Sequence, residues 1–195
     1  MSAAKKPLIP KWTEQDQWLP PGGPNYGTFP SMIERGSPVP SVKTKFVTQS
    51  GTEDTTSDVV LGTGLVAFFA VPGAFTPTCH VNHLPGFIDN DAKLRAAGVD
   101  RIVCASVNDH HVMRSWAEAS GALGKVDFLA DGNGELADAM GLSADMAAAG
   151  MGKRFRRSAA LIRDGIVEAV FLEDAPGVTT TGAPAILMAL ESARS

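Results

Sequence analysis

Residues 65–80 read LVAFFAVPGAFTPTCH, and this stretch limits both the fold and the chemistry of the chain. Its first seven residues are all apolar, which is typical of a strand buried on both faces of a sheet. The Pro-Gly pair that follows ends the strand, and a helix is predicted to begin near Thr78. Cys79 then lies in the first turn of a helix, where free backbone N–H groups and the helix dipole stabilise a thiolate.

Strand and helix signals alternate from about Ser31 to the end of the chain. Residues 159–162 and 166–172, joined by Asp164-Gly165, carry the signal of a β-hairpin. The other predicted strands are 59–61, 65–71, 102–107 and 126–130, and the predicted helices are 78–97 (kinked at Pro85-Gly86), 110–120 (capped by Asn108-Asp109), 136–140 and 184–193. This order predicts an α/β fold with a central sheet of mixed direction, flanked by helices.

The composition is that of one ordinary domain. The 195 residues are 44% hydrophobic and 19% charged, with a net charge of −4. A nucleic-acid partner would need a basic footprint, which is lacking, and no apolar run approaches the roughly 20 residues that span a bilayer. The N-terminus also lacks the apolar stretch of a secretory signal. We therefore expect no nucleic-acid or membrane partner and a cytoplasmic location, with an organelle as the alternative.

The first 30 residues form a Pro/Gly-rich N-terminal extension, and the domain is predicted over residues 31–195. The many prolines and glycines exclude a regular helix or a central strand in the extension. One hypothesis is a flexible tail. The other uses Trp12, Trp18 and Tyr26, with which the extension would wrap over the domain or contact another subunit.

Two cysteines, Cys79 and Cys104, lie 25 positions apart. This spacing is neither a CxxC pair nor a disulfide framework. A cysteine at a helix start is either inert packing or a reactive thiol, and local physics alone leaves both open for Cys79. Cys104 lies in the middle of a predicted strand, where we expect a small buried hydrophobic side chain.

The string PGAFTPTC, followed by HLPGF at 83–87, closely resembles the active-site segment of the type II peroxiredoxins, the peroxiredoxin-5-like group. The resemblance continues through VDRIVCASVND (99–109), LADG (129–132) and 141–165, and it covers about residues 31–192. It implies a thioredoxin-like fold. It also implies a thiol-dependent peroxidase that reduces hydrogen peroxide and alkyl hydroperoxides without a cofactor.

The resemblance also implies the roles of individual residues. Cys79 matches the peroxidatic cysteine, and Pro72 and Thr76 match the residues that shape its pocket. Arg157 falls where the family places its arginine. In the mechanism that follows, the Cys79 thiolate attacks peroxide and becomes a sulfenic acid, while Arg157, Thr76 and the backbone donate hydrogen bonds to the leaving oxygen. The remaining basic side chains of this segment are expected on a solvated face: Lys153, Arg154 and Arg156.

The loop before the last helix reads APGVTTTGAP (175–184) and contains no cysteine, although some family members carry a resolving cysteine there. We therefore predict a one-cysteine cycle in which an external thiol, glutathione with glutaredoxin or thioredoxin, attacks the sulfenic acid. The alternative is a peroxide-sensing relay, in which oxidised Cys79 passes its oxidation to a bound partner protein.

All four histidines lie near the cysteine or in the next predicted turn. A metal held by Cys79, His80 and His83 would occupy the nucleophile, so no metal is expected. For His83 we expect a structural hydrogen-bonding role. His110 and His111 fall at the dimer contact that the resemblance implies, so a homodimer is predicted. There they would make dimerisation pH-sensitive, accompany a weaker contact, or be exposed without consequence.

Overall fold

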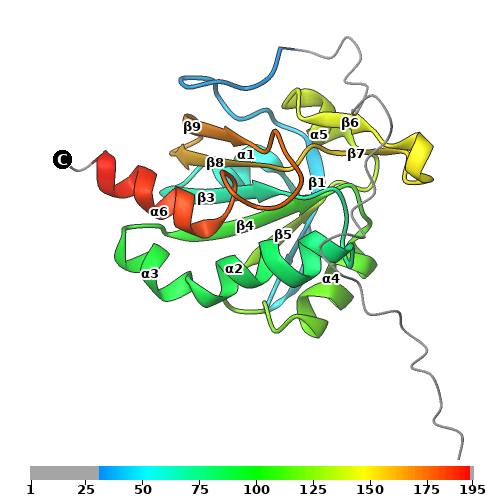
Figure 1. The fold of residues 1–195 in the computed structure, drawn as a ribbon, viewed down its shortest axis with the longest axis horizontal. Coiled ribbons are helices and arrows are strands. Elements are labelled where there is room, and N and C mark those ends of the chain that lie inside the picture. The colour runs from blue at the N-terminus through cyan, green and yellow to red at the C-terminus, as the bar shows by residue number, and fades with distance from the viewer. Residues whose placement is uncertain (1–30, 194–195) are drawn as a thin grey trace, which may run out of the picture.

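The computed structural model describes residues 31–193, so the predicted extension over residues 1–30 lies outside the described residues. The described chain forms a seven-stranded sheet with helices on both faces (Figure 1). The sheet order is β2-β1-β5-β4-β3-β8-β9, and its strands are β1 Lys43–Thr48, β2 Gly51–Thr56, β3 Leu65–Ala70, β4 Arg101–Ser106, β5 Asp127–Ala130, β8 Ser158–Arg163 and β9 Ile166–Leu172.

The helices are α1 Ser57–Leu61, the π-helix η2 Cys79–His83, α2 Leu84–Asp89, α3 Asp91–Ala96, α4 His110–Ala119, α5 Glu135–Ala139, the 3-10 helix η3 Ala147–Ala149 and α6 Ala183–Ser192. A second, two-stranded sheet consists of β6 Ser143–Asp145 and β7 Lys153–Phe155.

Strand β3 lies inside the sheet and all six of its residues are buried. It pairs parallel with β4 and antiparallel with β8, β4 pairs parallel with β5, and the hairpin β8–β9 extends the sheet beyond β3. The predicted sheet of mixed direction and the predicted hairpin are therefore both confirmed. Because the carboxyl ends of β3, β4 and β5 share one edge, the loop that leads to Cys79 leaves the sheet beside the loops that follow Ser106 and Ala130.

The sheet separates two hydrophobic cores, because successive side chains of a strand point to opposite faces. Phe69 of β3 packs with α2, α3, α4 and α6, and its ring stacks on that of Phe87 with centroids 4.0 Å apart. Phe68 packs on the other face with α1 and α5. Cys79 and Cys104 both belong to the first core, so the reactive segment lies on the face that α2, α3, α4 and α6 cover (Figure 1).

One predicted strand is wrong, because Val59 to Leu61 belong to helix α1. In a strand, residues 59 and 61 would share a face. Instead Val60 and Leu61 are both buried and Val59 is exposed, which is the burial pattern of a helical turn. The hairpin β1–β2 was not anticipated from the sequence, because β2 (GTEDTT) is polar and largely exposed and so lacks an apolar alternation.

The helix predicted over 78–97 is interrupted later than expected. It is divided at Asn90, between α2 and α3, and the side chain of Asn90 donates a hydrogen bond to the carbonyl of Gly86. Pro85 fits because it lies in the first turn of α2, where a missing N–H leaves no broken bond. The wider turn of η2 precedes it, with the N–H of Leu84 donating to the carbonyl of Cys79.

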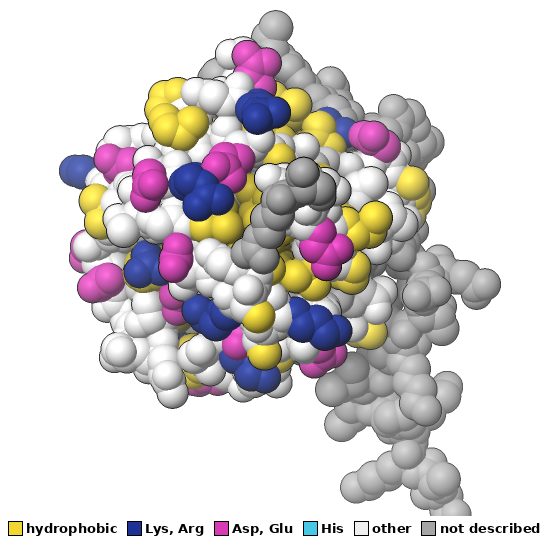
Figure 2. All heavy atoms as spheres, turned by 90° about the vertical axis from the view of Figure 1, so that its left-hand side faces the viewer, with side chains coloured by type: hydrophobic (Ala, Val, Ile, Leu, Met, Phe, Trp, Pro, Cys, Tyr) yellow, Lys and Arg dark blue, Asp and Glu magenta, His cyan; other side chains and the backbone are white. Residues whose placement is uncertain are grey.

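The face in Figure 2 carries Lys and Arg side chains interspersed with Asp and Glu, and no single sign of charge dominates it. Within residues 31–193, no helix has both the length and the apolar character needed to cross a membrane.

Candidate active site

Cys79 lies in the first turn of the helical segment that follows β3. The first hydrogen bond of this segment runs from the N–H of His80 to the carbonyl of Thr76, at 2.9 Å. The amide of Cys79 therefore belongs to the group of first-turn N–H groups that have no partner within the helix. The Cys79 side chain is fully buried. The prediction of a cysteine at a helix start is confirmed.

The loop before Cys79 is fixed by side chains at both of its ends. Thr76 donates its hydroxyl proton to the carbonyl of Gly73, at 2.9 Å. The N–H of Ala74 donates to the Asn108 side chain, at 3.0 Å. Because the Thr76 proton is used by Gly73, the Thr76 oxygen is left as a hydrogen-bond acceptor. This differs from the donor role expected from the sequence.

Arg154 does not lie on a solvated face as expected, but is half-buried against this loop. Its guanidinium donates to the carbonyls of Met151 at 2.8 Å, Val107 at 3.2 Å and Pro72 at 3.4 Å. Arg154 thus connects the end of β3 to the end of β4. The neighbouring Gly73 has little room for a side chain, because a Cβ there would lie 3.3 Å from the guanidinium and 3.0 Å from the Thr76 methyl carbon.

Arg157 reaches the site from the start of β8 and contacts His83 of η2. Its Nη1 lies 3.0 Å from His83 Nδ1, and the other ring nitrogen, Nε2, lies 3.0 Å from the carbonyl of Thr181. A carbonyl can only accept, so Nε2 carries the proton and Nδ1 accepts from Arg157. Burial, followed by the positive charge of Arg157, lowers the pKa of His83 to about 3. The expected hydrogen-bonding role of His83 is confirmed.

Cys104 belongs to the same hydrophobic core as Cys79. It is paired with Phe69 across β3 and β4 and is fully buried, as expected for a small hydrophobic side chain. Burial raises the pKa of the Cys104 thiol well above its ordinary value, and the charge of Cys79 raises it further, while Arg157 acts in the opposite direction. A thiol with a raised pKa is a poor nucleophile at neutral pH.

The other histidines surround or flank this site. His80 accepts a hydrogen bond from the indole N–H of Trp116 at 3.0 Å, and its ring lies 5.7 Å from that of Phe75. The rings of His110 and His111 lie at the start of α4 with centroids 3.9 Å apart and are tilted by 37°, and Asp109 caps this helix by accepting from two backbone N–H groups. Their place in a dimer contact stays a prediction. In the described part of the chain, no three His, Cys, Asp or Glu side chains gather as metal ligands would.

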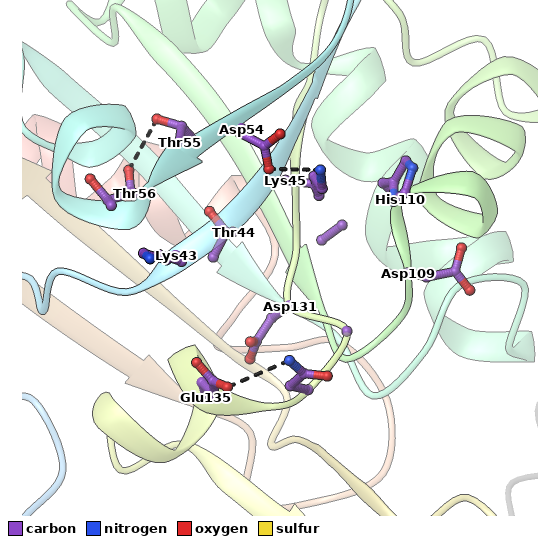
Figure 3. Close-up of a pocket in the computed structure, with 13 residues that line it drawn as sticks. Lys43, Thr44, Lys45, Asp54, Thr55, Thr56, Asp109, His110, Asp131 and Glu135 are labelled. Carbon is purple, nitrogen blue, oxygen red and sulfur yellow. Dashed lines mark hydrogen bonds and ion pairs between the residues drawn. The ribbon is translucent and has the colours of Figure 1, made fainter.

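A hollow of about 600 Å³ lies apart from Cys79, between β1, β2, the start of α4 and the turn after β5 (Figure 3). Several of its charges are already satisfied: Lys45 pairs with Asp54 at 2.7 Å, and the Asp131 carboxylate accepts from backbone N–H groups of α5. A second hollow, of about 340 Å³, lies between residues 81–89 and 178–184 and has His83 on its wall. Neither of these two hollows is lined by Cys79.

Residues 34–187 match the protein-family model described as Redoxin. Peroxiredoxin-2B of Arabidopsis thaliana is 40% identical over 159 residues, which are 81% of this chain and 98% of that protein. The chloroplastic Peroxiredoxin-2E-2 of Oryza sativa subsp. japonica is 51% identical over 126 residues, 63% of this chain. The chain spans only about half the length of the chloroplastic relatives, 56% and 53% for the rice and Arabidopsis proteins.

A solved structure described as reduced Prx3 in complex with H2O2, from Vibrio vulnificus, is also similar to the chain. It superposes with a TM-score of 0.78 at 37% identity, and the match covers 84% of this chain and 99% of that one. The expected thioredoxin-like architecture, with a mixed sheet between two layers of helices, is confirmed by this likeness.

Proposed function

The chain belongs to the type II peroxiredoxins of the Redoxin family, and from that premise we propose that it is a thiol-dependent peroxidase acting on hydrogen peroxide and alkyl hydroperoxides through Cys79. The observation that carries the proposal is a fully buried cysteine at the start of η2, with the Arg157 guanidinium 3.0 Å from His83 at the end of the same π-helix. The H2O2 named with the Vibrio vulnificus structure supports the choice of oxidant.

In the first step, the Cys79 thiolate attacks one peroxide oxygen. The S–O bond forms as the O–O bond breaks, and the leaving oxygen takes up a proton to depart as water or an alcohol. The sulfur is oxidised to a sulfenic acid. Arg157 donates toward the oxygen on which charge develops, which stabilises the transition state more than the ground state. The Thr76 oxygen accepts a hydrogen bond from the peroxide O–H, since the Thr76 hydroxyl already donates its own proton to the carbonyl of Gly73.

In the second step, an external thiol attacks the sulfenic sulfur, releasing water and forming a mixed disulfide with Cys79. A second external thiol then reduces that disulfide and restores the Cys79 thiol. This one-cysteine cycle is supported by the loop at 175–184, which has threonines and no cysteine, and by the full burial of Cys104. The reductant in our proposal is glutathione with glutaredoxin, or thioredoxin.

We further propose a homodimer, with His110 and His111 at the contact, and a cytoplasmic location. Relatives named as chloroplastic and mitochondrial keep an organelle as the alternative. The second candidate function, a redox relay to a partner protein, rests on the extension over residues 1–30, which lies outside the described residues. The peroxidase is therefore the function that we propose.

A reductant screen tests this proposal. Purified protein is mixed with hydrogen peroxide or an alkyl hydroperoxide and supplied with glutathione and glutaredoxin, with thioredoxin and its reductase, or with neither. We expect peroxide consumption in at least one reductant arm and, without reductant, a single added oxygen on Cys79 by mass spectrometry. A Cys79→Ser variant that consumes peroxide as fast as the wild type would refute the proposal.

A further inference from the structure

Glu173 is a buried acid with no part in the steps above. It follows β9, and only 9% of its surface is exposed. Its carboxylate accepts hydrogen bonds from three consecutive threonines, Thr179–Thr181: from their N–H groups at 3.0, 3.4 and 3.3 Å, from the hydroxyl of Thr181 at 2.8 Å, and from the hydroxyl of Thr179. Burial acts to raise the pKa of Glu173, but these hydrogen bonds outweigh it and lower the pKa to about 2. Glu173 is therefore a carboxylate at any working pH.

The threonine loop depends on Glu173 because packing does not hold it on every side. Val178, Thr179 and Gly182 line the hollow of about 340 Å³ that separates the loop from residues 81–89. Five hydrogen bonds to one carboxylate replace the packing that is missing there. A charged acceptor makes such bonds roughly twice as strong as neutral ones.

This loop supports the arginine of the active site through His83. The carbonyl of Thr181 accepts from His83 Nε2, and His83 Nδ1 accepts from the Arg157 guanidinium. At the other end of Arg157, its own carbonyl accepts from the N–H of Glu173, at 3.2 Å. The hydrogen bonds therefore close a ring in which Glu173 holds both the main chain and the guanidinium of Arg157.

We propose that Glu173 is a positioning residue of the peroxidatic site, acting through the Thr179–Thr181 loop and His83 to hold the Arg157 guanidinium for the reaction at Cys79. The proposal rests on the peroxidase function proposed above. Glu173 does not contact the reacting atoms. Its effect on the rate comes from the orientation of Arg157, since small misplacements of a group that stabilises a transition state cost rate steeply.

The test measures the second-order rate constant for oxidation of Cys79 by hydrogen peroxide in a single turnover without reductant. Glu173→Gln keeps the size of the side chain but presents an amide NH2 to the N–H and O–H donors of the loop. We expect the rate constant to fall by about tenfold, within the hundredfold that a 1 Å misplacement can cost. Glu168→Gln, which removes the charge of a carboxylate in an exposed ion pair on β9, the strand that precedes Glu173, is the matched control and is expected to leave the rate unchanged.

A double-mutant cycle separates positioning from a general structural effect. If Glu173 acts through Arg157, then Glu173→Gln has little further effect once Arg157→Lys is present, because the two changes remove the same interaction. Independent losses that multiply would overturn the proposal. If the Glu173→Gln variant does not fold, Thr181→Val takes its place in the double-mutant cycle. This change removes only the hydrogen bond from the Thr181 hydroxyl to Glu173.

The two proposals fail in different ways. A wild-type protein whose Cys79 does not react with peroxide refutes the peroxidase. A reactive wild type with an equally reactive, folded Glu173→Gln variant refutes only the role of Glu173.

Discussion

The Nη1 of Arg157 lies 3.0 Å from Nδ1 of His83, a histidine that is fully buried and neutral. The contact requires an unprotonated Nδ1, because a protonated imidazole has no acceptor to offer a guanidinium. The orientation of the active-site arginine is therefore coupled to the protonation state of one buried ring.

This coupling predicts a loss of stability in acid. The pKa of His83 is about 3 in the folded protein and about 6.5 in an unfolded chain, so between these pH values the unfolded state binds the extra proton. The contribution of His83 to the free energy of unfolding is therefore complete above pH 6.5. Below pH 6.5 it falls by up to about 1.4 kcal/mol per pH unit. Urea unfolding at several pH values from 7.5 to 5 measures this slope.

His83→Gln, which can still donate at one end and accept at the other but does not titrate, is the control for this experiment. The difference in unfolding free energy between wild type and variant should shrink as the pH falls from 6.5 to 5. Glu173, whose stabilisation is lost only below its unfolded pKa of about 4.5, does not interfere in that range. A difference that is constant over the range would show that His83 does not carry the effect.

The two cysteines should respond oppositely to substitution. Cys79→Ser removes the nucleophile, so we expect no peroxide reduction above background. Cys104→Ser should keep most of the activity with an external thiol, although its buried hydroxyl costs about 1–3 kcal/mol of stability. Cys104→Ala introduces no hydroxyl and is a second test of whether turnover needs Cys104. Steady-state peroxide consumption measures both, and a block of turnover in both Cys104 variants would mean that the one-cysteine cycle is wrong.

Arg154→Met should impair the site even though Arg154 was expected on a solvated face. The change keeps an unbranched, flexible side chain, although a shorter one, and removes the donors to Met151, Val107 and Pro72. Losing hydrogen bonds from a charged donor should lower the unfolding free energy by about 1–3 kcal/mol, and a loosened loop should slow oxidation of Cys79 about tenfold. Arg163→Met, at an exposed ion pair, is the control. If both variants retain the wild-type rate, Arg154 does not support the loop.

The sequence was sufficient where local signals and tertiary structure agree. The buried run at 65–71 became β3, and Asp164-Gly165 formed the hairpin turn with both residues at positive φ, as a tight turn needs. The strand predicted at Val59 to Leu61 was wrong, because three apolar residues do not distinguish a short strand from a helical turn.

The site was predictable only for residues that a motif names. Arg154, Arg156 and Arg157 look alike in sequence, and what separates them is where β7 and β8 deliver each side chain. The role of Glu173 depends on a loop whose carbonyl meets His83 across 98 positions of sequence. No local pattern contains such a contact.

Thr76 offers the sharpest test of the chemistry proposed for the loop. Its hydroxyl donates to Gly73 and leaves its oxygen free to accept from the peroxide. Thr76→Ser retains both functions and should stay within a few-fold of the wild-type rate of Cys79 oxidation, whereas Thr76→Val loses both and should fall by about a hundredfold. Thr78→Val is the matched control, since the Thr78 side chain makes no capping hydrogen bond at the start of η2. Stopped-flow oxidation by hydrogen peroxide measures all three variants. Equal losses in the Thr76→Val and Thr78→Val variants would assign the effect to a general disturbance of this loop and helix start, and the Thr76 hydroxyl would then have no specific role in binding the peroxide.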